Sequence, residues 1–186
     1  MHRSKFLFGL VSIFPLSGFA GNHLYTDGRK GIKIAAGEGR YNGRMRLQGT
    51  NTNLVDLKIS GKDTDGALAI FEQTSVSARG RTPLHVHSSQ DEYCFIVEGD
   101  FFFRVGPDEF SLGPGDSIFL PRKTPHGWAQ VSKKGRMTIT FQPAGKMEEF
   151  FLAVSSLKKT PAATELAQLF INADMKIVGP PVNPER

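Results

Sequence analysis

The sequence predicts an all-β fold, an antiparallel barrel or sandwich that ends in two short helices. About nine short apolar segments follow one another between residues 54 and 142, and several alternate apolar with polar residues. Turns rich in glycine and proline separate them at regular spacing, which is typical of sandwiches and barrels. Helical patterns begin only near residue 146. Because a chain of 186 residues can bury a single core, we expect one domain.

The first twenty residues have the layout of a secretory signal peptide. The basic residues Arg3 and Lys5 precede an apolar stretch over 6–16, and small residues lead to Ala20, after which we expect cleavage. The alternative is a membrane anchor, but the stretch is short and Pro15 interrupts it. We therefore predict a periplasmic or secreted protein with no stable membrane anchor after cleavage.

Charge and cysteine content narrow the classes of partner. The formal net charge of +5 falls by two when Arg3 and Lys5 leave with the signal peptide. No run of basic residues interleaves with aromatic ones, so we do not expect nucleic acid as a partner. The basic residues between 29 and 46 form either a solvated surface arm or an attractive surface for an anionic ligand. The single cysteine cannot form an internal disulfide.

The expected elements follow from local patterns. Residues 54–59 alternate, and the segment 67–72 follows Asp65-Gly66, a pair typical of hairpin turns. The remaining barrel strands are expected over 83–87, 92–97, 101–105, 109–112, 117–120, 126–131 and 136–142. The chain as a whole is expected to divide into a signal peptide (1–20), an N-terminal arm with a candidate edge strand at 32–34 (21–53), the barrel (54–145), and helices with a tail (146–186).

Two helices are expected after the barrel. One covers 146–158, and Pro161 marks the start of the second, because proline is favoured at the first helical position. Both have an apolar side, formed by Met147, Phe150, Phe151, Val154, Leu166, Leu169 and Phe170. We expect both helices to pack across one end of the barrel, with a role in dimerisation as the alternative. The tail over 179–184 is expected to be extended on the surface.

Four residues in two separate clusters have the chemistry of a metal site. His85 and His87 alternate along one expected strand and therefore point to the same face. Glu92 opens the next strand, and His126 opens a later one. Three imidazoles and one carboxylate suit iron, manganese, nickel, copper, cobalt or zinc, and an octahedral ion would keep two open positions. The alternative, histidines held by structural hydrogen bonds, is disfavoured by the shared ligand spacing.

Other interior positions follow from strand parity. Cys94 lies two residues beyond Glu92 and is interpreted as a small buried side chain, with a soft metal ligand or redox thiol as the alternative. Trp128 and Gln130 share the inward parity of His126. Trp128 either forms a pocket wall or belongs to the core.

The first cluster resembles the first motif of the cupin superfamily. His85, His87, Glu92 and the turn glycine Gly99 match this motif in spacing, and only its leading glycine, here Gly80, is displaced by one position.

The second cluster resembles the second cupin motif. Gly115, Pro121 and His126 match in spacing, whereas Lys123 replaces a glycine and Gln130 replaces an asparagine. Lys123 can change the shape of its turn without removing a ligand. Gln130 keeps a donor and an acceptor, so we expect it to serve beside the ligands.

The resemblance implies a cupin, or jelly-roll, β-barrel that binds a divalent transition metal. Gly-Glu-Gly-Arg at 37–40 and Gly-Pro-Pro at 179–181 are similar to segments of the quercetin 2,3-dioxygenase-like single-domain cupins. That likeness implies oxygenation of a small enolic or phenolic substrate, with Glu92 as catalytic base. The alternatives are a metal-dependent isomerase or decarboxylase acting on a sugar or organic acid, and a non-catalytic small-molecule-binding cupin. Exposed edge strands also lead us to expect a homodimer.

Overall fold

The computed structural model describes residues 28–48, 53–75 and 80–184. The chain divides into two units, Met1–Ile32 and Lys33–Arg186. The described residues of the first unit, 28–32, contain no helix or strand, and the expected signal peptide lies outside the described residues. None of the helices in the described part of the chain has the length and apolar character needed to cross a membrane.

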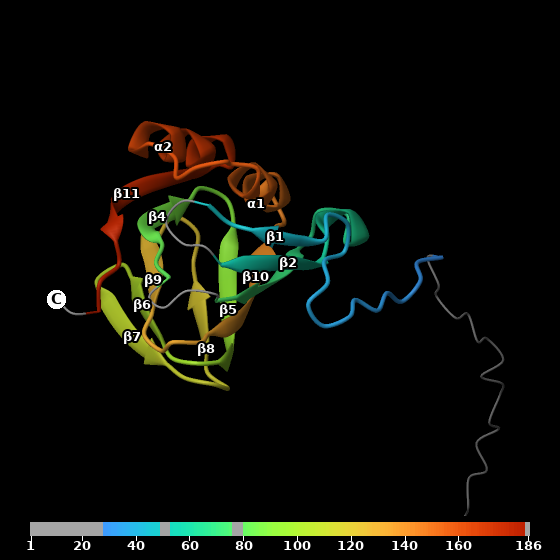
Figure 1. Cartoon of the computed structure of the whole chain (residues 1–186), viewed down its shortest axis with the longest axis horizontal. Coiled ribbons are helices and arrows are strands. Elements are labelled where there is room, and N and C mark those ends of the chain that lie inside the picture. Colours follow the sequence, from blue (N-terminus) through green and yellow to red (C-terminus); the bar gives the residue numbers. More distant parts are fainter. Residues whose placement is uncertain (1–27, 49–52, 76–79, 185–186) are drawn as a thin grey trace, which may run out of the picture. The chain divides into compact units, whose positions relative to one another are not determined.

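The second unit contains two antiparallel sheets (Figure 1). The first sheet has the order β1 (Arg44–Arg46), β2 (Leu54–Ile59), β3 (Ala69–Thr74), β10 (Arg136–Gln142), β5 (Asp91–Glu98) and β8 (Ser117–Leu120). The second has the order β11 (Met175–Pro181), β4 (Pro83–His87), β9 (His126–Gln130), β6 (Phe101–Val105) and β7 (Asp108–Leu112). A short 3-10 helix, η1 (Gly61–Asp63), connects β2 with β3. The all-β prediction is confirmed.

The core lies between the two sheets and follows the alternation of the strands. Along β10, for example, Met137, Ile139 and Phe141 are buried, and the residues between them are partly exposed. The same period of two runs through β3, because successive strand residues point to opposite faces of a sheet. Alternation in the sequence therefore decides which side chains face the interior.

The two helices, α1 (Met147–Ser155) and α2 (Ala163–Asn172), lie on the same side of the sheets (Figure 1). Phe151 of α1 packs on the fully buried Phe71 of β3, with ring centroids 4.7 Å apart. Phe170 of α2 packs edge-on against Phe150 of α1 at 5.0 Å. Since burial of one large apolar side chain contributes about 1.5–3 kcal/mol, these contacts hold the helices to the barrel.

Two elements differ from the expectation. The N-terminal edge strand is Arg44–Arg46, and residues 32–34 form no strand. Arg44 donates two hydrogen bonds to the buried carboxylate of Asp56 at 3.0 and 2.7 Å, which anchors this short strand to β2. The expected surface tail is partly β11, which pairs with β4 because Met175 and Ile177 alternate with polar or exposed neighbours. The segment is thus extended, as expected, and its first part is also held by pairing with β4.

Candidate metal centre

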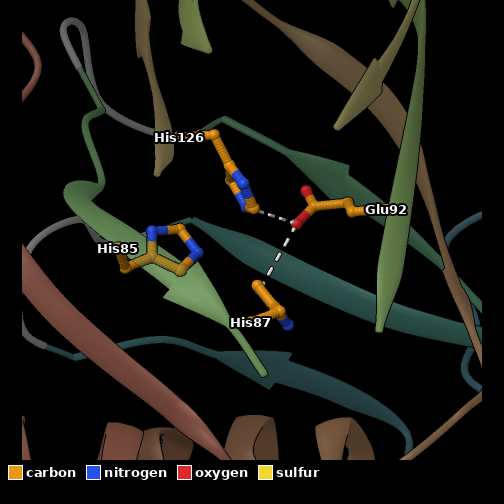
Figure 2. Close-up of side chains that lie close together, drawn as sticks. All are labelled: His85, His87, Glu92 and His126. Carbon is orange, nitrogen blue, oxygen red and sulfur yellow. Dashed lines mark ion pairs between the residues drawn. The ribbon is translucent and has the colours of Figure 1, made fainter. Parts of the chain in front are cut away.

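Both sheets contribute ligands to one cluster. His85 and His87 come from β4 and His126 from β9, whereas Glu92 comes from β5 in the opposite sheet. All four side chains are buried, and one ligand atom from each lies within 4.8 Å of the others. Figure 2 shows them pointing toward a common centre. The structure thus brings together the four residues that the sequence motifs single out.

Glu92 faces two of the histidines. Its Oε2 atom lies 3.6 Å from Nε2 of His87 and 3.4 Å from Nε2 of His126 (Figure 2). The ring of His85 completes the set, with its centroid 4.7 Å from that of His126 and 5.2 Å from that of His87. One carboxylate oxygen and three ring nitrogens can therefore face a single ion.

Hydrogen bonds determine which nitrogen of each histidine faces the centre. Nδ1 of His85 and Nδ1 of His126 each lie close to the backbone carbonyl oxygen two residues earlier, at 2.8 and 2.9 Å. Nδ1 of His87 lies 3.3 Å from Oε1 of Gln90. Because these three partners can only accept, the proton of each neutral ring belongs on Nδ1. The Nε2 lone pairs are then available to a metal.

The arrangement of these four side chains is suited to a divalent metal ion. Nε2 of His87 and Nε2 of His126 are buried and have no hydrogen-bond partner within the described residues. A buried unpaired polar atom costs about 1–3 kcal/mol, and here two lone pairs face a carboxylate with no donor between them. A cation removes this conflict, and three nitrogens with one oxygen suit a first-row transition metal.

The protonation states agree with this interpretation. Burial lowers the pKa of His85 to about 3, with repulsion from the other two histidines adding to the effect. Burial also lowers the pKa of His87. For Glu92, burial alone would raise the pKa, but the facing histidines, His126 first, outweigh it and lower the pKa to about 2. A carboxylate and neutral imidazoles are the forms that bind metal.

Cys94 supports Glu92 from the side away from the histidines. Its thiol donates to Oε1 of Glu92 at 3.4 Å, and Oε2 is left for the centre. Burial raises the pKa of the thiol, so it stays protonated and remains a donor. Cys94 does not belong to the group of possible ligands found among the described residues.

Of the other two residues expected at the site, Trp128 and Gln130, only one lines the cavity. Trp128 is buried and lines the cavity beside the ligands. Gln130 is also buried, but its amide donates to the carbonyl of Ser132 at 2.7 Å and does not line that cavity. Only Trp128 of this pair is therefore brought to the site.

Gln90 is a site residue that the sequence analysis missed. Its Oε1 accepts from His87, and its Nε2 donates to the carbonyls of Pro143 and Ala144 at 3.2 and 2.7 Å. In the sequence it is one polar residue of the turn before Glu92, and its carbonyl partners lie more than fifty residues away. No local signal could have revealed this bridge between a ligand and the approach to α1.

Lys123 keeps a backbone conformation that favours glycine. Its φ angle is +63°, and its N–H donates to the carbonyl of His87 at 2.8 Å. For a residue other than glycine, this left-handed conformation costs about 1–2 kcal/mol of free energy. The turn before His126 thus has a glycine-like conformation in spite of the lysine, and its backbone is tied to the strand that carries two ligands.

A cavity opens on the ligands, and the centres of water-sized molecules can occupy about 70 Å³ of it. Its walls come from the strands and from both helices, and most are apolar. Phe170 lies edge-on to His85 with ring centroids 5.4 Å apart, and Phe141 stacks near His87 at 5.6 Å. The remaining apolar walls are Leu47, Ile139, Met147, Phe150, Phe151, Val154, Leu166 and Met175.

Comparison with known proteins identifies the barrel. Residues 74–141, which contain the whole ligand set, match the family model of the cupin domain. The barrel has the cupin fold. This match confirms the jelly-roll prediction and supports the cupin superfamily, whereas the finer resemblance to quercetin 2,3-dioxygenase-like proteins stays a prediction.

Individual relatives are distant. The chain is 35% identical over 61 residues to an uncharacterized protein of Methanocaldococcus jannaschii, and the match covers 33% of this chain and 49% of that protein. The match thus spans about half the length of the curated relative. The polyketide cyclase RemF from Streptomyces resistomycificus superposes with a TM-score of 0.51 at 20% identity, covering 61% of this chain and 80% of its own. An RmlC-like cupin from Shewanella frigidimarina gives 0.47 at 20%, covering 56% and 88%.

Proposed function

We propose that this cupin is a metal-dependent oxidoreductase of the dioxygenase type, acting on a small enolic or phenolic compound. The observation that carries the proposal is the combination of a buried three-histidine, one-glutamate set with a largely apolar cavity that several phenylalanines line. Phenylalanine walls favour a planar apolar substrate, whereas a sugar would need many more polar partners. The signal-peptide pattern of residues 1–20 supports a location of the protein in the periplasm or outside the cell.

The residues of the chain have defined tasks in this reaction. A divalent metal held by the four ligands would supply Lewis-acid and redox chemistry. Glu92, ionised and facing His87 and His126, takes the proton of the substrate hydroxyl, and the thiol of Cys94 orients its carboxylate. Phe141 and Phe170 hold the substrate ring over the ligands and exclude water. Both atoms of O₂ enter the product, so the reaction needs no external reductant.

Glu92→Gln tests this assignment. The amide keeps the shape of the side chain but cannot take the proton, so we expect metal content to remain largely intact and turnover to fall by about 10²–10⁴-fold. Elemental analysis gives the metal content, and an oxygen electrode gives the turnover of flavonols and simpler enols. Unchanged turnover in the variant would remove Glu92 from proton transfer.

The same screen separates the alternatives. Turnover of a sugar or organic acid without oxygen uptake would replace the proposal with a metal-dependent isomerase or decarboxylase. A fully loaded protein that binds phenols but converts none of the compounds would be a binding cupin.

A further inference from the structure

The cavity contains polar groups that the metal chemistry does not use. Gln73, on β3, is only 4% exposed and lines the cavity. Its carboxamide makes no hydrogen bond to any residue in the described part of the chain. It is also not among the fully enclosed unpaired atoms, as Oε1 of Gln130 is, so the amide keeps contact with the cavity space. An amide so deeply buried and unpaired needs a partner from the cavity.

Trp128 provides a second unused group in the same cavity. The residue is 4% exposed, and within the described ranges only its backbone is hydrogen-bonded to Thr82. Its N–H donates to the hydroxyl of Thr82 at 3.0 Å, and its carbonyl accepts from the N–H of Thr82 at 2.9 Å. The indole N–H, a donor only, is not among the enclosed unpaired atoms either. Two polar groups with no partner among the described residues thus belong to residues that line a cavity whose walls are otherwise mostly apolar.

The strand register places Gln73 away from the ligands. Phe141 of β10 pairs with Glu92 on one side and with Ala69 on the other, so Ala69 lies at the level of Glu92. Gln73 is four residues further along β3 and pairs with Met137. At about 3.3 Å per residue, this separates the two levels by about 13 Å along the strand. Trp128 is two residues, about 7 Å, beyond His126.

We infer that Gln73 is a specificity-determining residue that binds a second oxygen function of the substrate, with the indole N–H of Trp128 as an additional donor. The substrate class is then an elongated one. An enol or phenol at one end meets the ligands, an aromatic body fills the phenylalanine-lined space, and a hydroxyl or carbonyl at the other end meets Gln73. The nature of the first group rests on the proposed function, whereas the second follows from Gln73 itself.

A pair of probes that differ in one remote hydroxyl tests the inference. We would load the protein with Zn²⁺, which is inert to redox chemistry, and titrate it with 3-hydroxyflavone and with 3,4′-dihydroxyflavone. Trp128 is the only tryptophan, so its fluorescence reports occupancy of the cavity directly. The wild type is expected to bind the dihydroxy probe about tenfold more tightly, the effect of one well-placed hydrogen bond.

The variants assign this preference to Gln73. Gln73→Leu and Gln73→Met should bring the affinity ratio down to about one while binding 3-hydroxyflavone no worse than the wild type. A general folding defect would instead weaken both probes. Gln168→Leu is the matched control, because it makes the same change on the exposed face of α2 and should keep the tenfold ratio.

The outcomes distinguish this inference from the proposed function. Equal affinities in the wild type, or a ratio that survives in both Gln73 variants, would overturn the inference and leave the oxygenation proposal standing. A ratio that depends on Gln73, without oxygen uptake by the iron- or manganese-loaded protein, would support the inference and contradict oxygenation. If neither probe binds, both fail.

Discussion

The orientation of His87 depends on a single amide. Gln90 accepts from Nδ1 of His87 and is itself held by two backbone carbonyls before α1. We predict that Gln90→Met lowers metal affinity by about 10–100-fold, because the ring loses the acceptor that fixes its tautomer and direction. Competition with a chromophoric chelator measures the affinity.

Gln130→Met is the matched control for this prediction. Gln130 is equally buried and also donates to a backbone carbonyl, but within the described residues its side chain makes no hydrogen bond to any of the four ligands. The variant Gln130→Met should therefore lower thermal stability without changing metal affinity. Equal affinities for Gln90→Met and the wild type would show that the bridge to α1 does not position the ligand.

At the scale of elements, one carboxylate connects the N-terminal arm with the turn between β2 and β3. Asp63 accepts two hydrogen bonds from Arg40, at 3.2 and 3.0 Å, and one from the backbone N–H of Ser60 at 3.0 Å. The Ser60 hydroxyl in turn accepts from Lys62, which completes a capping box around η1. The arm is therefore attached to the barrel through an ion pair as well as through β1.

This ion pair predicts a pH dependence of stability. The hydrogen bonds from Arg40 lower the pKa of Asp63 below its ordinary 3.8 in spite of some desolvation. The folded protein therefore holds the proton less tightly than the unfolded chain, and the stabilisation is present above pH 3.8 and lost as pH falls through the lowered pKa. Asp63→Asn should be less stable than the wild type at pH 7, and the difference should shrink below about pH 4.

Thermal unfolding at a series of pH values measures this difference. Asp108→Asn, an exposed carboxyl at the start of β7 with no described ion pair, should unfold like the wild type throughout. A constant gap between Asp63→Asn and the wild type down to pH 2 would exclude the ion pair as its cause.

At the scale of the whole molecule, the ligand set joins the two sheets. Without an ion, two buried nitrogens face a carboxylate with no donor between them. Metal binds only the folded arrangement, and at about 1,000 times its Kd it adds about 4 kcal/mol to the free energy of unfolding. For a domain of this size, we predict a rise in Tm of about 10 °C on adding metal to chelator-treated protein, measured by calorimetry. His126→Gln should lose most of this rise, and an equal rise in that variant would place the metal elsewhere.

Exposed aromatic side chains on the outer face of the first sheet lead us to predict an interface between two copies of the chain. Tyr93 pairs directly with Phe119, and the two rings are 41% and 58% exposed near the free edge formed by β8. Because exposed aromatic rings beside an open strand edge favour association, we predict a homodimer in gel filtration coupled to light scattering. Phe119→Lys should give monomers, whereas Ile171→Lys on α2 should not. A monomeric wild type at high concentration would contradict this prediction.

The sequence by itself determined the strands between residues 54 and 142, the inward parity of His85 and His87, and the chemistry of the ligand set, but neither β1 nor β11. These properties are local, since a period of two and the spacing of ligands can be read within a few residues. Only the tertiary structure decided that Gln90 bridges to Ala144 and that the side chain of Gln73 lines the cavity without a partner among the described residues. Such contacts depend on register between strands and on loop closure across long stretches of chain, and no local pattern encodes either.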